Sequence, residues 1–247
     1  MAIYLKKFET QAAYEAAQSG LILPNVSLTV DNNTVHYNPL SPTPPTPSHD
    51  YVEIGGVKWA TMNVGANSVT DTGLYFQWGD TQGYTAAQVG SGEGQKYFSE
   101  DDYKYYNDGS YTKYNSEDGL ITLQSTDDAV TAAWGGGWRM PTVSEFIALG
   151  EAVTSAWTAD YQGSGVAGVV LTSNADGTTL FFPACSLAIF GSVGNVGSDG
   201  FYWSSSLDTD CGSSGNAYSL VFDSDSVNLA EQSGRFRGYS VRGVLGE

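Results

Sequence analysis

The sequence predicts an α+β protein in which antiparallel strands and long loops outweigh the helices. Three observations carry this prediction. Thirty glycines are spread through the 247 residues, which favours turns over long helices. Two segments have a capped helical pattern, and short runs of alternating apolar and polar residues recur along the chain. Hydrophobic residues make up 41% of the chain, which is ample for a core.

A proline-rich linker at residues 39–49 divides the chain into a small module, residues 1–38, and a large domain, residues 50–247. The linker favours polyproline II and acts as a semi-rigid spacer. In the small module, residues 9–18 predict a helix, and residues 26–30 and 34–37 predict a hairpin. So small a unit is unlikely to be stable alone, and we expect it to dock onto its own copies or a larger assembly.

Two helices are predicted in the large domain. The first, residues 129–134, follows a capping box at 125–128 and stops at three glycines. The second follows a capping box of Thr142 and Glu145, and Phe146, Leu149 and Val153 form its apolar stripe. Strands are predicted at residues 57–61, 74–78, 166–172 and 178–182, with a turn at 174–177. Residues 83–119 have the composition of a long surface insertion held down by its aromatic side chains.

Segment 200–244 interleaves apolar residues at sheet spacing with residues of unrelated chemistry. Within residues 217–223, Leu220 and Phe222 fall on one face, and Ser219, Val221 and Asp223 on the other. We therefore expect the first pair to be buried and the other three to be exposed. A fixed frame with a chemically mixed outer face suits recognition of a partner better than catalysis.

Charge and composition exclude several classes of function. The formal charge of −17 repels phosphate backbones and anionic lipid, so we expect neither nucleic-acid nor membrane-surface binding. No apolar run approaches the roughly 20 residues that span a bilayer, and the N-terminus lacks the pattern of a signal peptide. The histidines, His36 and His49, lie in the module and the linker, so we expect no catalytic residues, metal or cofactor. Cys185 and Cys211 either pair or stay free.

Five short motifs occur in order: VKWATMNVGA at 57–66, YFQWGD at 75–80, WGGGWRMPT at 134–142, YWSS at 202–205 and SVR at 240–242. Together they resemble the Fibrobacter succinogenes major paralogous domain family of Bacteroidetes and their phages. That family is similar to C-type lectin-fold proteins, including the variable proteins of diversity-generating retroelements. The resemblance covers roughly residues 51–244 and implies a C-type lectin-like fold. The module and linker also resemble the start of Bacteroides phage or prophage tail-tip proteins.

In such retroelements a reverse transcriptase rewrites template adenines, so that Asn codons scatter into many residue types. The resemblance implies a variable region at about 185–244 and a non-enzymatic receptor-binding protein. That protein would be a tail adhesin, made without a signal peptide, that binds a bacterial surface protein or glycan. By analogy, we expect a homo-oligomer or assembly into a virion through the N-terminal module. The candidate ligand-binding residues are Ala188, Ile189, Phe190, Phe201, Asp208, Asp210, Cys211, Ser213, Tyr218, Ser219, Val221, Asp223, Asp225, Phe236, Arg237 and Tyr239.

Two alternatives stay open. A formylglycine-generating-type copper oxidoreductase shares the fold, and here Cys185 and Cys211 would have to bind the copper. A secreted bacterial surface adhesin is the other alternative. The chain lacks the Glu-Pro-Asn, Gln-Pro-Asp and Trp-Asn-Asp signatures of calcium-dependent sugar-binding lectins, so the resemblance implies neither calcium nor sugar specificity.

Overall fold

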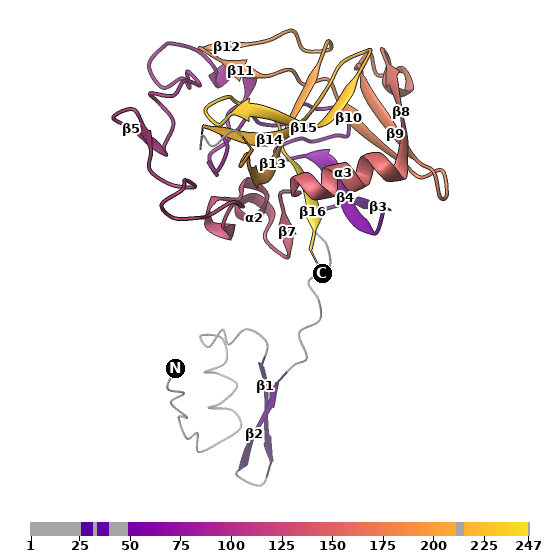
Figure 1. The fold of residues 1–247 in the computed structure, drawn as a ribbon. Helices are drawn as coiled ribbons and strands as arrows, with labels where there is room; N and C mark the ends of the chain where they lie inside the picture. Colours follow the sequence, from indigo (N-terminus) through magenta and orange to yellow (C-terminus); the bar gives the residue numbers. More distant parts are fainter. Residues whose placement is uncertain (1–25, 32–33, 40–48, 211–214, 247) are drawn as a thin grey trace. The chain divides into compact units, whose positions relative to one another are not determined.

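The computed structural model describes residues 26–31, 34–39, 49–210 and 215–246. Residues 1–46 and 47–247 form two compact units. In the small unit, β1 (Val26–Asp31) and β2 (Thr34–Pro39) pair antiparallel, which confirms the predicted hairpin (Figure 1). The predicted helix at 9–18 and most of the linker lie outside the described residues.

The large unit is a mixed α+β structure with open antiparallel sheets (Figure 1). One sheet has the order β3-β4-β16-β7, namely Tyr51–Ile54, Val57–Asn63, Arg242–Leu245 and Trp138–Arg139. A second has the order β13-β14-β15, namely Gly200–Leu207, Asn216–Phe222 and Val227–Gly234. A third has the order β10-β9-β8, namely Thr179–Pro183, Gly168–Ser173 and Val153–Thr158. Because β4, near the start of this unit, pairs with β16, near its end, the two ends of the unit lie in one sheet.

Two short hairpins extend from this frame. They are β5 (Tyr106–Asn107) with β6 (Ser110–Tyr111), and β11 (Ala188–Ile189) with β12 (Ser192–Val193). In the described residues, 3-10 turns occupy Ala86–Gln88, Ser125–Asp127 and Tyr161–Gly163. The predicted strand at 74–78 is wrong. Tyr75 and Phe76 each form a single isolated bridge, to Tyr84 and to Tyr239, so no continuous ladder develops there.

The second predicted helix begins where the sequence places it. In α3 (Val143–Ala152), the Thr142 hydroxyl accepts the Glu145 N–H at 3.2 Å. The Glu145 carboxylate accepts the Thr142 N–H at 2.8 Å. These reciprocal bonds confirm the capping box and satisfy donors that the helix itself leaves open. The predicted stripe ends early, because Val153 belongs to β8 rather than to α3.

The first predicted helix is present as α2 (Ala129–Trp134), but its cap differs. Asp128 is the N-cap, and one of its carboxylate oxygens accepts the N–H groups of Val130 and Thr131, both at 2.9 Å. The expected capping box at 125–128 is therefore wrong. Residues 125–127 form a 3-10 turn instead, and this turn leads the chain into the helix.

Strand β13 is buried on both faces and separates the two halves of the core. Successive side chains of a strand point to opposite faces. Accordingly, Tyr202 packs in one cluster with Trp59 and Phe182. Trp203 packs in the other with Trp78. These five aromatic side chains are all fully buried, so the sheet β13-β14-β15 is packed on both faces at β13.

The expected exposure of Ser219 in β14 is wrong. Its side chain is buried rather than exposed, and its hydroxyl lies 3.1 Å from that of Ser233. Ser219 pairs with Trp203 and therefore lies on the same face of the sheet as Trp203 and Ala217. Both of these residues belong to a core cluster, so this face of β14 is covered as well. Leu220 and Phe222 are buried as predicted. Val221 is only half-exposed and Asp223 is exposed.

Candidate ligand-binding surface

The structure divides the predicted ligand-binding residues by exposure. Phe190, at 56% exposed, is one of four candidates on the surface. The exposed candidates are Phe190, Asp210, Asp223 and Asp225. The half-buried candidates are Ile189, Phe201, Tyr218, Val221, Phe236 and Arg237. Cys211 and Ser213 lie outside the described residues.

Four candidates are buried and cannot touch a ligand in this conformation, so the prediction is wrong for them. Ala188 lies in a core cluster, and its backbone pairs with Gly238. Tyr239 stacks on the Trp203 ring with centroids 4.2 Å apart. Ser219 lies on the face of β14 that packs in the core with Trp203 and Ala217. Asp208 is 1% exposed, and its carboxylate accepts the Asp210 N–H at 2.9 Å.

Three aromatic side chains, two exposed and one half-buried, form a cluster at the surface. Phe190, in the turn between β11 and β12, lies with its ring centroid 6.0 Å from that of Phe236 and 6.2 Å from that of Tyr97. Tyr97 is 42% exposed. These separations are those of favourable aromatic pairs. We call Tyr97, Phe190 and Phe236 the aromatic cluster.

The backbone at Phe190 is strained. Phe190 and Gly191 have φ values of 48° and 72°, as in a type I′ hairpin turn, where Asn-Gly is the preferred pair. For a bulky residue this left-handed region costs about 1 kcal/mol or more. The turn is held by two bonds, from Phe190 N–H to the Phe98 carbonyl at 3.3 Å and from Gly191 N–H to the Tyr97 carbonyl at 2.6 Å. A large apolar side chain is thus displayed where local sterics favour a small polar one.

One buried glutamine connects the two loops that carry Tyr97 and Phe236. Gln77 is 1% exposed, and its side-chain amide donates to the Phe236 carbonyl and to the Asp102 carboxylate, both at 2.9 Å. Asp102 also accepts the N–H groups of the two residues that follow Tyr97, at 3.0 and 2.8 Å. The loops are therefore held together beneath the aromatic cluster.

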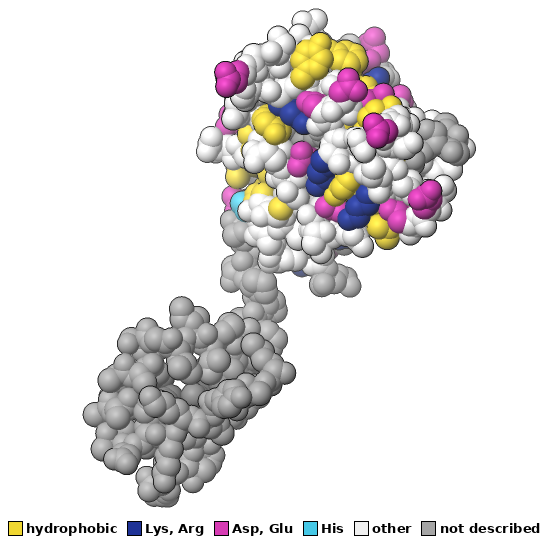
Figure 2. Space-filling view, turned by 90° about the vertical axis from the view of Figure 1, so that its left-hand side faces the viewer, with side chains coloured by type: hydrophobic (Ala, Val, Ile, Leu, Met, Phe, Trp, Pro, Cys, Tyr) yellow, Lys and Arg dark blue, Asp and Glu magenta, His cyan; other side chains and the backbone are white. Residues whose placement is uncertain are grey.

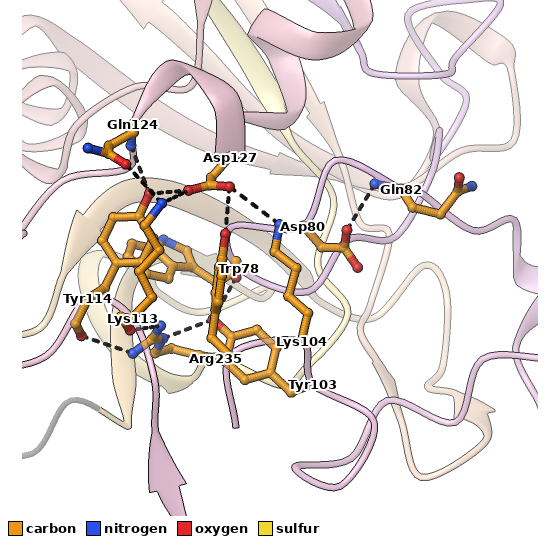
Figure 3. Close-up of polar contacts among 11 residues, drawn as sticks. Trp78, Asp80, Gln82, Tyr103, Lys104, Lys113, Tyr114, Gln124, Asp127 and Arg235 are labelled. Carbon is orange, nitrogen blue, oxygen red and sulfur yellow. Dashed lines mark hydrogen bonds and ion pairs between the residues drawn. The ribbon is translucent and has the colours of Figure 1, made fainter. Parts of the chain in front are cut away.

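Arg235 holds the loop that carries Phe236 on its buried side. Its side chain is fully buried, and its guanidinium carbon lies 4.8 Å from the ring centroids of both Trp78 and Tyr111. Its N–H groups donate to the Tyr103 hydroxyl at 3.0 Å and to the Tyr114 carbonyl at 3.1 Å. Figure 3 shows Arg235 with Trp78, Tyr103 and Tyr114. Because three of these aromatics belong to the insertion at 83–119, Arg235 ties that insertion to the end of β15.

Asp127 lies at the other end of the network in Figure 3. Its carboxylate accepts hydrogen bonds from Lys113 and Tyr105, both at 2.5 Å, and from Tyr114 at 2.6 Å. Lys104 lies 3.5 Å away. Burial alone would raise the pKa of Asp127, but these hydrogen bonds and Lys104 outweigh it and lower the pKa to about 2. The carboxylate therefore stays charged at neutral pH and holds the insertion down.

The remaining exposed candidates lie at the two ends of β14. Before the strand, Asp210 accepts the Tyr218 hydroxyl at 2.6 Å, and this bond with partial burial raises the pKa of Tyr218 to about 12. After it, Asp223 accepts the N–H groups of Asp225 and Ser226, both at 2.8 Å, and shapes the β14–β15 turn. A seven-residue strand is roughly 20 Å long, so Asp210 and Asp223 belong to separate groups rather than to one patch.

Figure 2 views the side of the molecule that carries β5, β11 and β12. Hydrophobic side chains reach the surface there, among separate acidic and basic ones (Figure 2). Tyr97 belongs to the aromatic cluster, although it was not among the residues predicted from the sequence. The insertion was expected to be fastened by its aromatics, and the sequence does not distinguish Tyr97 from buried Phe98 beside it.

Cys185 carries a free, fully buried thiol. Burial raises the pKa of the Cys185 thiol, although hydrogen bonds with groups such as Tyr202 oppose the change. Its sulfur lies 2.9 Å from the Tyr202 hydroxyl. Among the described residues, no three His, Cys, Asp or Glu side chains come together as they would around a metal ion. Copper binding with Cys211 stays an untested alternative, since Cys211 is outside those residues.

Comparisons of this chain with protein families, with curated proteins and with solved structures returned no match. None of the helices in the described part of the chain has both the length and the apolar character needed to cross a bilayer.

Proposed function

We propose that this protein is a non-enzymatic receptor-binding protein with a C-type lectin-like fold, the adhesin of a phage or prophage tail, and that it binds a bacterial surface protein or glycan through side chains diversified by a retroelement. The proposed location is the virion or the extracellular surface. The small N-terminal unit would provide oligomerisation or attachment.

The observation that carries the proposal is the contrast between buried motifs and displayed side chains. Trp59, Trp78, Trp138 and Trp203, from four of the five ordered motifs, are at most 1% exposed. Phe190 is displayed at 56% exposure on a strained backbone. Strain of this kind persists where the surroundings impose it, and it is concentrated at functional sites. Exposed aromatics on a rigid frame are typical of adaptable recognition surfaces.

Asn is the residue that a type I′ turn favours at position 190. An Asn codon whose adenines have been rewritten can encode Phe, so diversification accounts for a Phe at a position where the backbone favours Asn. Deep sequencing of this gene in a population of the source organism tests the point. We expect variation at Phe190 and Phe236, and none at Trp203 or Arg242. Equal variation at all four of these positions would contradict diversification.

Binding is tested with the fluorescently labelled full chain on a panel of bacterial strains by flow cytometry. The test variant carries Tyr97→Ser, Phe190→Ser and Phe236→Ser. The control carries Ile121→Ser and Ile147→Ser, two apolar residues that are 59% and 42% exposed elsewhere on the surface. We expect the test variant to lose staining and the control to keep it, with both folded by circular dichroism. Equal staining of the two variants would contradict the assignment of the site.

A further inference from the structure

Strand β8 is an open edge of the three-stranded sheet β10-β9-β8 (Figure 1). It pairs with β9 over six residues without a register shift. Its sequence, VTSAWT, has no charge, proline or bulge. Soluble proteins commonly blunt an exposed edge with such features, because an unprotected edge recruits another strand. The edge of β8 can therefore accept another strand.

The hydrogen-bond pattern shows which backbone groups of β8 point outward. The Asn174 N–H donates to the Ala152 carbonyl at 2.9 Å, and these two residues continue the β8–β9 register by one step. Because hydrogen-bonded and non-hydrogen-bonded pairs alternate in an antiparallel ladder, alternate residues from position 154 onward bond to β9. The N–H and C=O groups of Val153, Ser155 and Trp157 therefore point away from β9, to the open edge.

A groove runs along this edge, between β8 and β15. Its first part is an apolar cavity of about 180 Å³ lined by Gly150, Val153, Ser155, Leu171, Val227 and Leu229. An apolar cavity of about 150 Å³ holds a benzene-sized group, so this one accepts a large apolar side chain. Ser155 and Val227 also line the second part of the groove, so the two parts lie next to each other.

The second part of the groove has a different character. This cavity of about 130 Å³ is lined by Trp157 on one side and by the β14–β15 turn on the other, including Asp223 and Asp225. The carboxylates are exposed. The groove thus changes from apolar to acidic over two residues of β8, from Ser155 to Trp157. Side chains two residues apart on a strand point to the same side, so one added strand can reach both parts.

We propose that β8 binds an extended segment of a partner protein by strand addition, with an apolar side chain in the first cavity and a Lys or Arg two residues away beside Asp223 and Asp225. The partner's backbone bonds to Val153, Ser155 and Trp157, as in other strand-addition complexes. A second copy of β8 is a poorer occupant, because the strand carries no basic residue and leaves the acidic turn without a counter-charge. This site is separate from the aromatic cluster, so either can fail alone.

The test uses fluorescein-labelled Thr-rich octapeptides that contain Leu and Lys two residues apart, in both orders, and measures anisotropy with the full chain. In Ser155→Pro the outward N–H is lost without breaking a bond to β9, and Pro is tolerated at such edge positions. Ser155→Ala is the matched control, since it keeps the N–H. We expect Ser155→Pro to weaken binding by about tenfold or more and Ser155→Ala to change it little. Replacing the peptide Lys with Glu, or combining Asp223→Asn with Asp225→Asn, should weaken binding by about fivefold to tenfold.

If Ser155→Pro does not fold, a peptide N-methylated at alternate residues removes the same hydrogen bonds from the other side. Equal binding of the methylated and unmethylated peptides would overturn the proposal. So would equal affinity for the Lys and Glu peptides, or the absence of saturable binding up to 1 mM peptide. Sedimentation of the full chain completes the test. A dimer that Ser155→Pro dissolves would assign the edge to a second copy and refute the proposed partner.

Discussion

Replacing Asp127 with Asn tests whether a buried carboxylate holds the insertion at 83–119 to the frame. Asp127 is 7% exposed, and its pKa is lowered from the ordinary value of 3.8 to about 2. Each pKa unit corresponds to about 1.4 kcal/mol, so the charged form stabilises the fold by about 2 kcal/mol at neutral pH. In Asp127→Asn one oxygen becomes an NH₂ group. That NH₂ group then faces the donors of Lys113 and Tyr114. The substitution should therefore lower the free energy of unfolding by at least this amount.

The pH dependence identifies the cause. Because the pKa of Asp127 is lower in the folded state than in the unfolded state, its contribution is fully present above about pH 4 and is lost as the pH falls through about 2. We expect urea unfolding to show a difference of at least about 2 kcal/mol between the wild type and Asp127→Asn at pH 7, and a difference smaller by about 1 kcal/mol at pH 3. Glu93→Gln, a change at an exposed position, is the control. A difference that is the same at pH 7 and pH 3 would refute the electrostatic explanation.

Three further predictions concern the frame. Thr142→Ala removes the α3 cap and should lower the free energy of unfolding by about 1 kcal/mol, measured by urea unfolding, whereas Thr142→Ser should retain most of it. Gln77→Ala leaves the Phe236 carbonyl without this bond and should cost about 1–3 kcal/mol; thermal unfolding unchanged within error would contradict that. Cys185 should react with a maleimide only after denaturation, because its thiol is buried and its pKa is raised; the Cys211→Ser background isolates it, and rapid labelling of the folded protein would contradict the prediction.

Local signals in the sequence predicted much of the fold. The hairpin at 26–37, the strands around 57–61, 166–172 and 178–182, and the cap at Thr142 depend on nearby residues, and the structure confirms them. The errors occur where distant residues decide the outcome. Tyr75 and Phe76 bond to different partners, so an apolar run that resembles a strand forms none. At α2 the sequence offered several acceptors in succession, and packing selected Asp128.

The candidate site was less predictable for the same reason. The two-residue alternation places Ser219 on the face opposite Leu220 and Phe222, but the sequence does not show that a second core cluster covers that face. Tyr239 belongs to the same chemically mixed segment as Phe236, yet it is fully buried against Trp203. Exposure of Phe190 was predicted correctly. Tyr97 was missed because its role depends on a contact with a residue more than ninety positions away.

The contacts beneath the aromatic cluster explain how a recognition surface can vary without loss of the fold. Arg235 and Gln77 hold the loop through buried bonds that use the Arg235 side chain and the Phe236 carbonyl. None of these three bonds depends on which side chain occupies position 236. At position 190, the hydrogen bonds that hold the turn use backbone N–H groups, so they are also independent of the side chain. Substitutions on this surface should therefore change the free energy of unfolding by about 0.5 kcal/mol or less, except where they relieve or worsen the left-handed strain at Phe190. The same reasoning predicts that variation at Arg235 itself is not tolerated, because its guanidinium is buried against Trp78 and Tyr111 and Lys cannot reproduce the flat, multi-donor contact.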